Sequence, residues 1–534
     1  MRSVETVLAL VVLATVVAAF ANRLRVPAPS LLVVAGLVVG LLPGVPPVRV
    51  TPGVVSLVVL PPLLYAASEE LPWRDVRDVW RPVTLLAVGL VLASAAAVAL
   101  VAAALTTLTA SMAFVLGAVL ASTDPVAVTA LGRRLSLPSR VQALVQAESL
   151  FNDATSLVLF RIAVSLAVTG AAAGTSAGTR WLHGLGQFAV LAGGGALAGA
   201  VIAAGIAIIR RRITDPVLET VVALVTPYAA YVLAEAAGVS GVTAVIVAGL
   251  ILGAQLPRVS TPQTRLQLHS VYQTVIFLLE SVVFSLIGLE LPTLIRALSA
   301  DGRRWPLAAL AVAGTLIATR VLWVFPLSAV IQWRRGAGRL TWQVPAVVSW
   351  AGTRGVVPLA AALSIPLTTA ATPASPTTVP LPGRDLVLVL AAAVIAISLT
   401  VQGLTLEPLV RLAGLSRPAA DTRHEETVAR LRLAEAGLAR LEELAVAEAA
   451  PDAVIDHLRR GLEARISATR ARMQDHPDLG LTGAADRDIR RELIAVENAE
   501  LKRLYENGII SDVTRRRLQR SLDLEATGLG DDHH

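Results

Sequence analysis

ASTDPVAV, residues 121–128, interrupts a long apolar stretch with an acidic residue and a proline. Proline removes a backbone donor and clashes with the carbonyl four residues earlier, so a helix breaks there and main-chain oxygens are freed. A second interrupted stretch, WAGTRGVVPLA (350–360), carries two glycines, an arginine and a proline. Two broken helices inside apolar segments are the feature of this sequence that decides the fold.

The surrounding sequence is typical of a membrane protein. Hydrophobic residues make up 55% of the 534 residues, and the mean hydropathy is +0.68, which is well above that of soluble domains. A helix of about 17–25 apolar residues spans a bilayer. The sequence therefore predicts an all-α polytopic membrane protein with about 13 spans, at roughly 4–21, 29–45, 52–68, 83–106, 109–132, 141–168, 184–209, 216–236, 240–256, 271–295, 305–331, 343–366 and 386–413.

The arginines predict the orientation, because cytoplasmic loops carry an excess of basic residues. If the loop after the first helix is cytoplasmic, the loops on its side carry 16 arginines, against six on the opposite side. We therefore expect an N-terminus outside and a C-terminal tail on the cytoplasmic side of the membrane. The first stretch is predicted to be a retained helix rather than a signal peptide, since Glu5 interrupts it.

Charge and cysteine content exclude some functions. The net charge of +7 is accounted for by basic loops that contact anionic lipid, and nothing indicates nucleic-acid binding. Cysteine is absent, so disulfides and thiolate metal sites are excluded.

Composition changes sharply near Gly414, so we predict a transmembrane domain over 1–415 and a cytoplasmic helical tail over 416–534. Residues 430–450 have leucine and alanine at helical spacing, with charges on the other face. After Pro451 the pattern resumes, and two further helices are expected to join at Asn507-Gly508. The sequence leaves two interpretations of this tail: it regulates transport or stabilises a dimer, or it is a solvated helical appendage.

The broken helices also predict an inverted repeat. If helices 1–6 and 8–13 are related by an offset of seven, the fifth helix, with 121–128, corresponds to the twelfth, with 350–360. Interrupted segments at corresponding positions of two halves indicate the binding site of a secondary transporter.

Charged side chains within the spans predict where that site lies. Each costs at least ~2.5–3.5 kcal/mol at mid-membrane and needs a partner or a function. Asp124 follows Thr123 and precedes the helix-breaking Pro125, and a carboxylate beside hydroxyl and freed carbonyl oxygens suits a small hard cation. The alternative is an aspartate that caps the broken helix. The other charged candidates are Glu148, Asp153, Glu280, Arg320 and Arg354.

ESLFND, residues 148–153, brings several polar groups onto one helix. Ser149 and Asp153 are four residues apart and share a face, with Glu148 and Asn152 beside them. Desolvation raises the pKa of a buried carboxyl group, which can then hold a proton or a cation but not both well. Such competition is enough to couple two opposed fluxes.

Arg354 requires a buried counter-charge, and Glu148 is the predicted partner in a structural ion pair. The alternative is two unrelated charges that reach opposite membrane surfaces.

TDP (123–125), ESLFND (148–153) and GTRGVV (352–357), in that order, resemble the bacterial sodium/proton antiporters of the monovalent cation:proton antiporter family, relatives of the animal sodium/proton exchangers. The resemblance implies a thirteen-helix fold with crossed broken helices, a homodimer, and a core domain that moves against a dimer domain. It implies that Asp153 binds cation and proton, with Asn152 nearby and with Asp124, Ser149 and Thr123 as further sodium ligands, and that Glu148 pairs with Arg354.

The resemblance also implies electroneutral exchange of one sodium for one proton, for pH and sodium homeostasis, because Asn152 precedes Asp153. It implies no enzymatic reaction and no cofactor.

LPPLLYAASEELPW (60–73) departs from the family pattern: Ala66 stands where many relatives have an acid, and Glu69 and Glu70 are not expected to replace it. Glu280 is either an accessory group in the cytoplasmic funnel or an interfacial charge, and Arg320 is a second accessory candidate.

Other functions are weighed against this one. A potassium/proton antiporter would use the same site, and a cation channel would conduct without coupled proton movement, although no TVGYG filter is present. An intramembrane aspartyl protease built from Asp124 and Asp153 would need carboxylates that share a proton, and no GxGD sequence is present. A membrane sensor with output from the tail lacks a nucleotide or catalytic motif there. The sequence leaves open the choice among sodium, lithium and potassium.

Overall fold

A computed structural model describes residues 11–17, 19, 28–42, 52–71, 73–124, 137–169, 177–213, 215–259, 262–298, 304–334, 341–369, 379–415, 419–447, 451–473 and 477–507, with scattered residues beyond. Most of the first predicted span and the continuation of the first broken helix after Asp124 lie outside these residues, as do Gly508 of the predicted tail junction and most residues after it.

The chain divides into two compact units, Met1–Ser416 and Arg417–His534. In the described residues, the second unit consists of α18 (Ala419–Val446), α19 (Asp452–Met473) and α20 (Pro477–Glu506) with short helical segments beyond. Helices α18 and α19 pack together, and Arg470 pairs with Glu435 across them at 2.9 Å. The described residues of the predicted tail are therefore helical, and the position of the tail on the cytoplasmic side stays a prediction.

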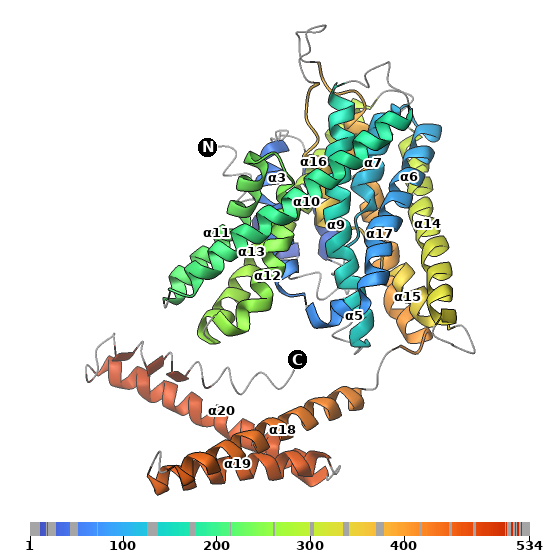
Figure 1. The fold of residues 1–534 in the computed structure, drawn as a ribbon. Helices are drawn as coiled ribbons and strands as arrows, with labels where there is room; N and C mark the ends of the chain where they lie inside the picture. Colours follow the sequence, from blue (N-terminus) through green and yellow to red (C-terminus); the bar gives the residue numbers. More distant parts are fainter. Residues whose placement is uncertain are drawn as a thin grey trace. The chain divides into compact units, whose positions relative to one another are not determined.

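The first unit is helical throughout its named elements (Figure 1). Its elements are α2 (Ala28–Leu41), α3 (Pro52–Val58), α4 (Leu60–Glu69), α5 (Trp73–Thr84), η1 (Leu85–Leu90), α6 (Val91–Leu105), α7 (Ala110–Ala121), α9 (Ser139–Thr169), α10 (Ala177–Arg210), α11 (Pro216–Ala236), α12 (Gly241–Val259), α13 (Pro262–Ala297), α14 (Trp305–Arg334), α15 (Gln343–Trp350), α16 (Val356–Leu363) and α17 (Arg384–Leu412).

Among the described residues, eight helical stretches are long and apolar enough to cross a membrane, and three shorter apolar helices accompany them. The prediction of a polytopic all-α protein is confirmed. The count of thirteen stays a prediction, because parts of the first and fifth spans lie outside the described residues.

The membrane helices pack in two groups (Figure 1). Helices α6, α7, α9, α14 and α17 pack mainly against one another, whereas α2, α4, α10, α11, α12 and α13 form the second group. Small residues bring backbones close within the second group: a Cβ on Gly36 would lie 2.2 Å from the Ser285 carbonyl oxygen, and one on Gly288 would lie 2.2 Å from that of Val33. Such close contacts hold membrane helices together where no hydrophobic driving force exists.

Both predicted helix breaks are present, and they touch each other. Helix α7 ends at Ala121, Ser122 has an extended backbone and residues 122–124 are not helical, while residues 351–355 separate α15 from α16. Asp124 donates its backbone N–H to the carbonyl of Thr353 at 2.7 Å, and the Thr353 hydroxyl donates to the carbonyl of Asp124 at 2.9 Å. The two predicted helix breaks therefore lie in contact at Asp124 and Thr353.

Candidate cation site

The broken end of α7 exposes main-chain carbonyls that other helices satisfy. The last four carbonyls of a helix have no partner within it. Ser156 of α9 donates to the Ala118 carbonyl at 2.6 Å, and Arg354 Nε donates to the Leu120 carbonyl at 2.7 Å. A cation at a helix C-terminus also complements the helix dipole. Arg354, from the second break, therefore stabilises the first break.

Three atoms of Thr123 form hydrogen bonds with side chains of α9. The Ser149 hydroxyl donates to its carbonyl at 2.5 Å, and Asn152 Nδ2 donates to its hydroxyl at 2.5 Å. The Thr123 backbone N–H donates in turn to Asn152 Oδ1 at 3.3 Å. All three residues are buried, so the segment after α7 has a fixed position against α9.

Asp153 lies beside that segment and is also buried. The Ser122 hydroxyl donates a hydrogen bond to its carboxylate. Asp124 and Asp153 lie close enough for their charges to repel each other. The buried carboxylate of Asp153 and the half-buried carboxylate of Asp124 thus gather with neighbouring hydroxyls and main-chain carbonyls. Such oxygen-rich surroundings suit a hard monovalent cation.

The second break makes room for Asp124. A Cβ built on Gly355 would lie 1.5 Å from Asp124 Oδ2, so the carboxylate occupies the space that any side chain at 355 would need. A Cβ on Gly352 would similarly lie 2.6 Å from Cδ of Arg320. The two glycines of GTRG therefore accommodate one carboxylate and one arginine.

The predicted ion pair between Glu148 and Arg354 is wrong, because Glu148 binds a different arginine. Glu148 instead forms a bidentate ion pair with Arg320 of α14, with Nη1 to Oε1 at 2.6 Å and Nη2 to Oε2 at 2.7 Å. Arg320 also donates from Nε to the Val348 carbonyl near the broken end of α15 at 3.1 Å. Its planar fork can serve a carboxylate and a carbonyl at once, which is why the charge on α14 is the better partner.

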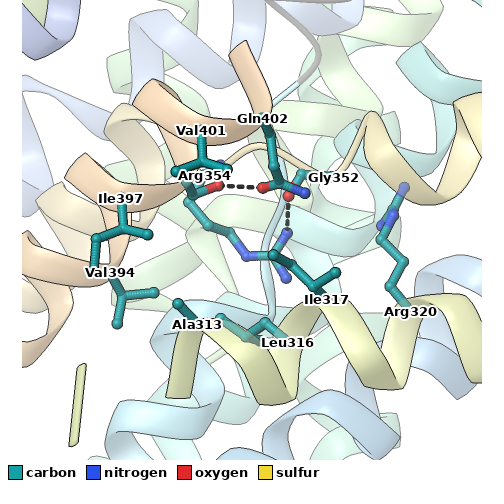
Figure 2. Close-up of a pocket in the computed structure, with 11 residues that line it drawn as sticks. Ala313, Leu316, Ile317, Arg320, Gly352, Arg354, Val394, Ile397, Val401 and Gln402 are labelled. Carbon is teal, nitrogen blue, oxygen red and sulfur yellow. Dashed lines mark hydrogen bonds between the residues drawn. The ribbon is translucent and has the colours of Figure 1, made fainter. Parts of the chain in front are cut away.

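Arg354 instead lies among main-chain carbonyls. Figure 2 shows it reaching across a small cavity between α14 and α17 to the Gly352 carbonyl, a contact of 2.6 Å. Its backbone N–H donates to the Ser398 hydroxyl at 3.1 Å, and that hydroxyl donates to Gln402 Oε1 at 2.5 Å. The charges of Glu148 and, to a smaller extent, Asp153 attract the Arg354 guanidinium. Arg354 therefore acts on both carboxylates through its charge, without a hydrogen bond to either among those found in the described residues.

The remaining candidates divide between this site and another cluster. Glu280 of α13 is close enough to Asp124 for their charges to repel. Ala66 is buried in α4, where its methyl group offers no oxygen. Glu69 approaches Arg210 of α10 at 3.9 Å, so it belongs to a separate ion cluster.

Several residues of the site were not singled out by sequence reasoning. These are Ser122, Thr353, Gly352, Gly355 and Ser398. The first four belong to the two interrupted stretches, so their position next to the charged residues was an available signal. Ser398 lies in an apolar run of α17 that carries no such signal.

Two helix breaks that meet beside acidic side chains within apolar segments are typical of a secondary transporter. The family model for the transmembrane sodium/hydrogen exchanger matches residues 9–412, and the chain belongs to that family.

Individual relatives agree with this assignment. An uncharacterized Na(+)/H(+) exchanger of Mycobacterium tuberculosis is 34% identical over 98% of this chain and 96% of its own length. The Na(+)/H(+) antiporter ApNhaP of Aphanothece halophytica is 32% identical over 78% of this chain and 75% of its own length. The fold is similar to that of the sodium proton antiporter MjNhaP1 from Methanocaldococcus jannaschii, with a TM-score of 0.60 and 20% identity over 76% of this chain and 99% of that one.

Proposed function

We propose that this protein exchanges sodium for protons across the bacterial inner membrane, without an enzymatic reaction or a resident cofactor. The observation that carries the proposal is the gathering of buried Asp153, Thr123 and Ser149 with half-buried Asp124 where the two helix breaks meet. A carboxylate in such surroundings binds a proton or a cation in turn, which couples the two fluxes. The names of the relatives favour sodium over potassium.

We also propose electroneutral exchange of one sodium for one proton. Glu148 and Arg320 cancel each other's charge within a bidentate pair. Asn152, directly before Asp153 on α9, is an amide and adds no second acidic charge next to that carboxylate. Glu280 of α13 is close enough to Asp124 for their charges to repel, so its part in the charge balance is tested separately. The arginine distribution in the loops supports a cytoplasmic tail, and family membership supports a homodimer.

Exchange in proteoliposomes tests the function. With an inward proton gradient reported by a trapped pH dye, sodium, lithium and potassium are added in turn to wild type and to Asp153→Asn. We expect sodium-dependent dequenching that the substitution abolishes. Asp385→Asn is the matched control, because Asp385 lies in the first turn of α17 with a side chain 48% exposed. Unchanged exchange in Asp153→Asn would refute the proposed site.

Charge movement separately tests the stoichiometry. On solid-supported membranes, a one-for-one exchange should give no sustained sodium-driven current in wild type or in Glu280→Gln. A sustained current in wild type would contradict electroneutral exchange, and a current that appears only in Glu280→Gln would place Glu280 in the charge balance.

A further inference from the structure

An ion pair distant from the breaks joins the two groups of membrane helices. Arg161 lies eight residues after Asp153 on α9, about 12 Å further along the helix. Its guanidinium pairs with Glu235 at the end of α11, and Nη1 also donates to the Val239 carbonyl at 3.4 Å. Arg161 thus connects the helix that carries Asp153 to the corner between α11 and α12.

The corner itself is tightly built. Glu235 Oε1 accepts a hydrogen bond from the backbone N–H of Gly241, the first residue of α12, at 3.0 Å. A Cβ on Gly241 would lie 2.8 Å from that same oxygen, so glycine leaves room for the carboxylate. Gly238, with a φ of 73°, turns the chain between the two helices. One oxygen of Glu235 is therefore fixed to its own corner, and the other faces Arg161.

The two ion pairs of α9 differ in the energy needed to break them. Arg320 and Glu148 have side chains only 3% and 1% exposed, within the group of helices that holds the site, and breaking such a buried pair is strongly destabilising. Arg161 and Glu235 have side chains 34% and 28% exposed, and a partly exposed pair contributes far less. The weak pair is the one that crosses between the groups.

Alternating access requires the helices that carry a binding site to move against the remainder of the protein. Resting on the sodium/proton exchange proposed above, we propose that the Arg161–Glu235 ion pair is a breakable latch between α9 and the α11–α12 corner. It holds the conformation seen here and opens when the site is presented to the other side. Arg161 and Glu235 are positioning residues, since they act on access to Asp153 without touching the cation.

The absence of cysteine from the chain allows a direct test. In Arg161→Cys/Glu235→Cys, a short bis-methanethiosulfonate cross-linker should lower sodium/proton exchange at least tenfold, and reductant should restore it. A long, flexible linker and the two single-cysteine variants treated with the same reagents should leave exchange near the untreated rate. Full exchange with the short cross-link in place would overturn the latch.

A second measurement tests the Arg161–Glu235 latch even if the double-cysteine variant is inactive. Loss of a latch shifts the population of two conformations, which changes the apparent affinity on each side in opposite directions. Arg161→Gln and Glu235→Gln should each move the half-saturating sodium concentration by about twofold to fivefold, in opposite directions on the two sides, and the double variant should move it no further. Arg161→Lys should recover part of the shift. An equal change on both sides would overturn the latch.

Failure of the latch and of the proposed function are distinguishable. If wild type exchanges sodium for protons and the cross-linked protein does too, the latch alone is refuted. If wild type shows no sodium-dependent proton movement, both the proposed function and the latch that depends on it are refuted.

Discussion

The two helix breaks receive the same kind of support but supply different chemistry. The end of α7 is capped by Arg354 at the Leu120 carbonyl, and the end of α15 by Arg320 at the Val348 carbonyl. Each arginine places a positive charge at the negative end of a helix dipole. After its cap, the first break continues with Ser122, Thr123 and Asp124, whereas the second continues with GTRG.

This difference assigns a role to each break. The first break supplies oxygen atoms that can bind a cation, and α9 completes them with Asp153. The second break supplies space for Asp124 at Gly355 and a positive charge in Arg354. Substitutions in the first break should therefore change cation affinity, while those in the second should change the position of the first or the stability of the fold.

The largest effect is expected from Gly355→Ala. Its Cβ would lie 1.5 Å from Asp124 Oδ2, so the carboxylate must leave its position and sodium/proton exchange in proteoliposomes should be lost. Gly314→Ala is the matched control, because a Cβ at Gly314 of α14 meets nothing within 4 Å. If Gly355→Ala exchanged as fast as Gly314→Ala, the position of Asp124 would not matter for transport.

The next effect is on stability. Glu148→Gln leaves Arg320 as an uncompensated buried charge, which costs about 3–5 kcal/mol, so the melting temperature and folded yield in detergent should fall more than the apparent sodium affinity. Glu443→Gln, in the exposed pair with Arg440, is the control and should leave both unchanged.

A double substitution distinguishes the two candidate partners of Glu148. Glu148→Gln/Arg320→Gln should recover part of the lost melting temperature, since neither charge is then left alone, whereas Glu148→Gln/Arg354→Gln should not. Recovery with Arg354 and none with Arg320 would reinstate the pair that the sequence predicted.

Sequence reasoning reached the breaks because proline, glycine and charge inside apolar runs have local consequences. It singled out Asp124 by the helix-breaking proline beside it and Asn152 and Asp153 by spacing along one helix, and the structure brings these residues together. It assigned Glu148 to Arg354 because a buried arginine requires a buried counter-charge. Arg320 stands alone in an apolar helix, and its approach to Glu148 depends on how α14 packs against the second break, which spacing within a helix does not encode.

A smaller effect is expected in the first break. Ser122→Ala removes the hydroxyl that donates to Asp153. The ionised carboxylate then loses a stabilising donor, and sodium, which needs that ionised form, should bind about tenfold less tightly, the equivalent of about 1.5 kcal/mol for a hydrogen bond to a charged group. Half-saturating sodium in the exchange assay measures this. Ser165→Ala, whose hydroxyl donates to Ile162 within α9, should not move it.

The smallest effect is expected where the breaks touch. Thr353→Val keeps the shape of the side chain and removes one of two hydrogen bonds to Asp124, while the bond from the Asp124 N–H to the Thr353 carbonyl remains. A neutral hydrogen bond contributes about 0.5–1.5 kcal/mol, and the surviving bond limits the displacement, so we expect exchange to slow by about twofold to threefold with little change in half-saturating sodium. Thr84→Val, at an exposed hydroxyl of α5 bonded within its own helix, is the control. A larger loss of sodium affinity in Thr353→Val than in Ser122→Ala would reverse the roles of the two breaks, because the second break would then bind the cation and the first would position it.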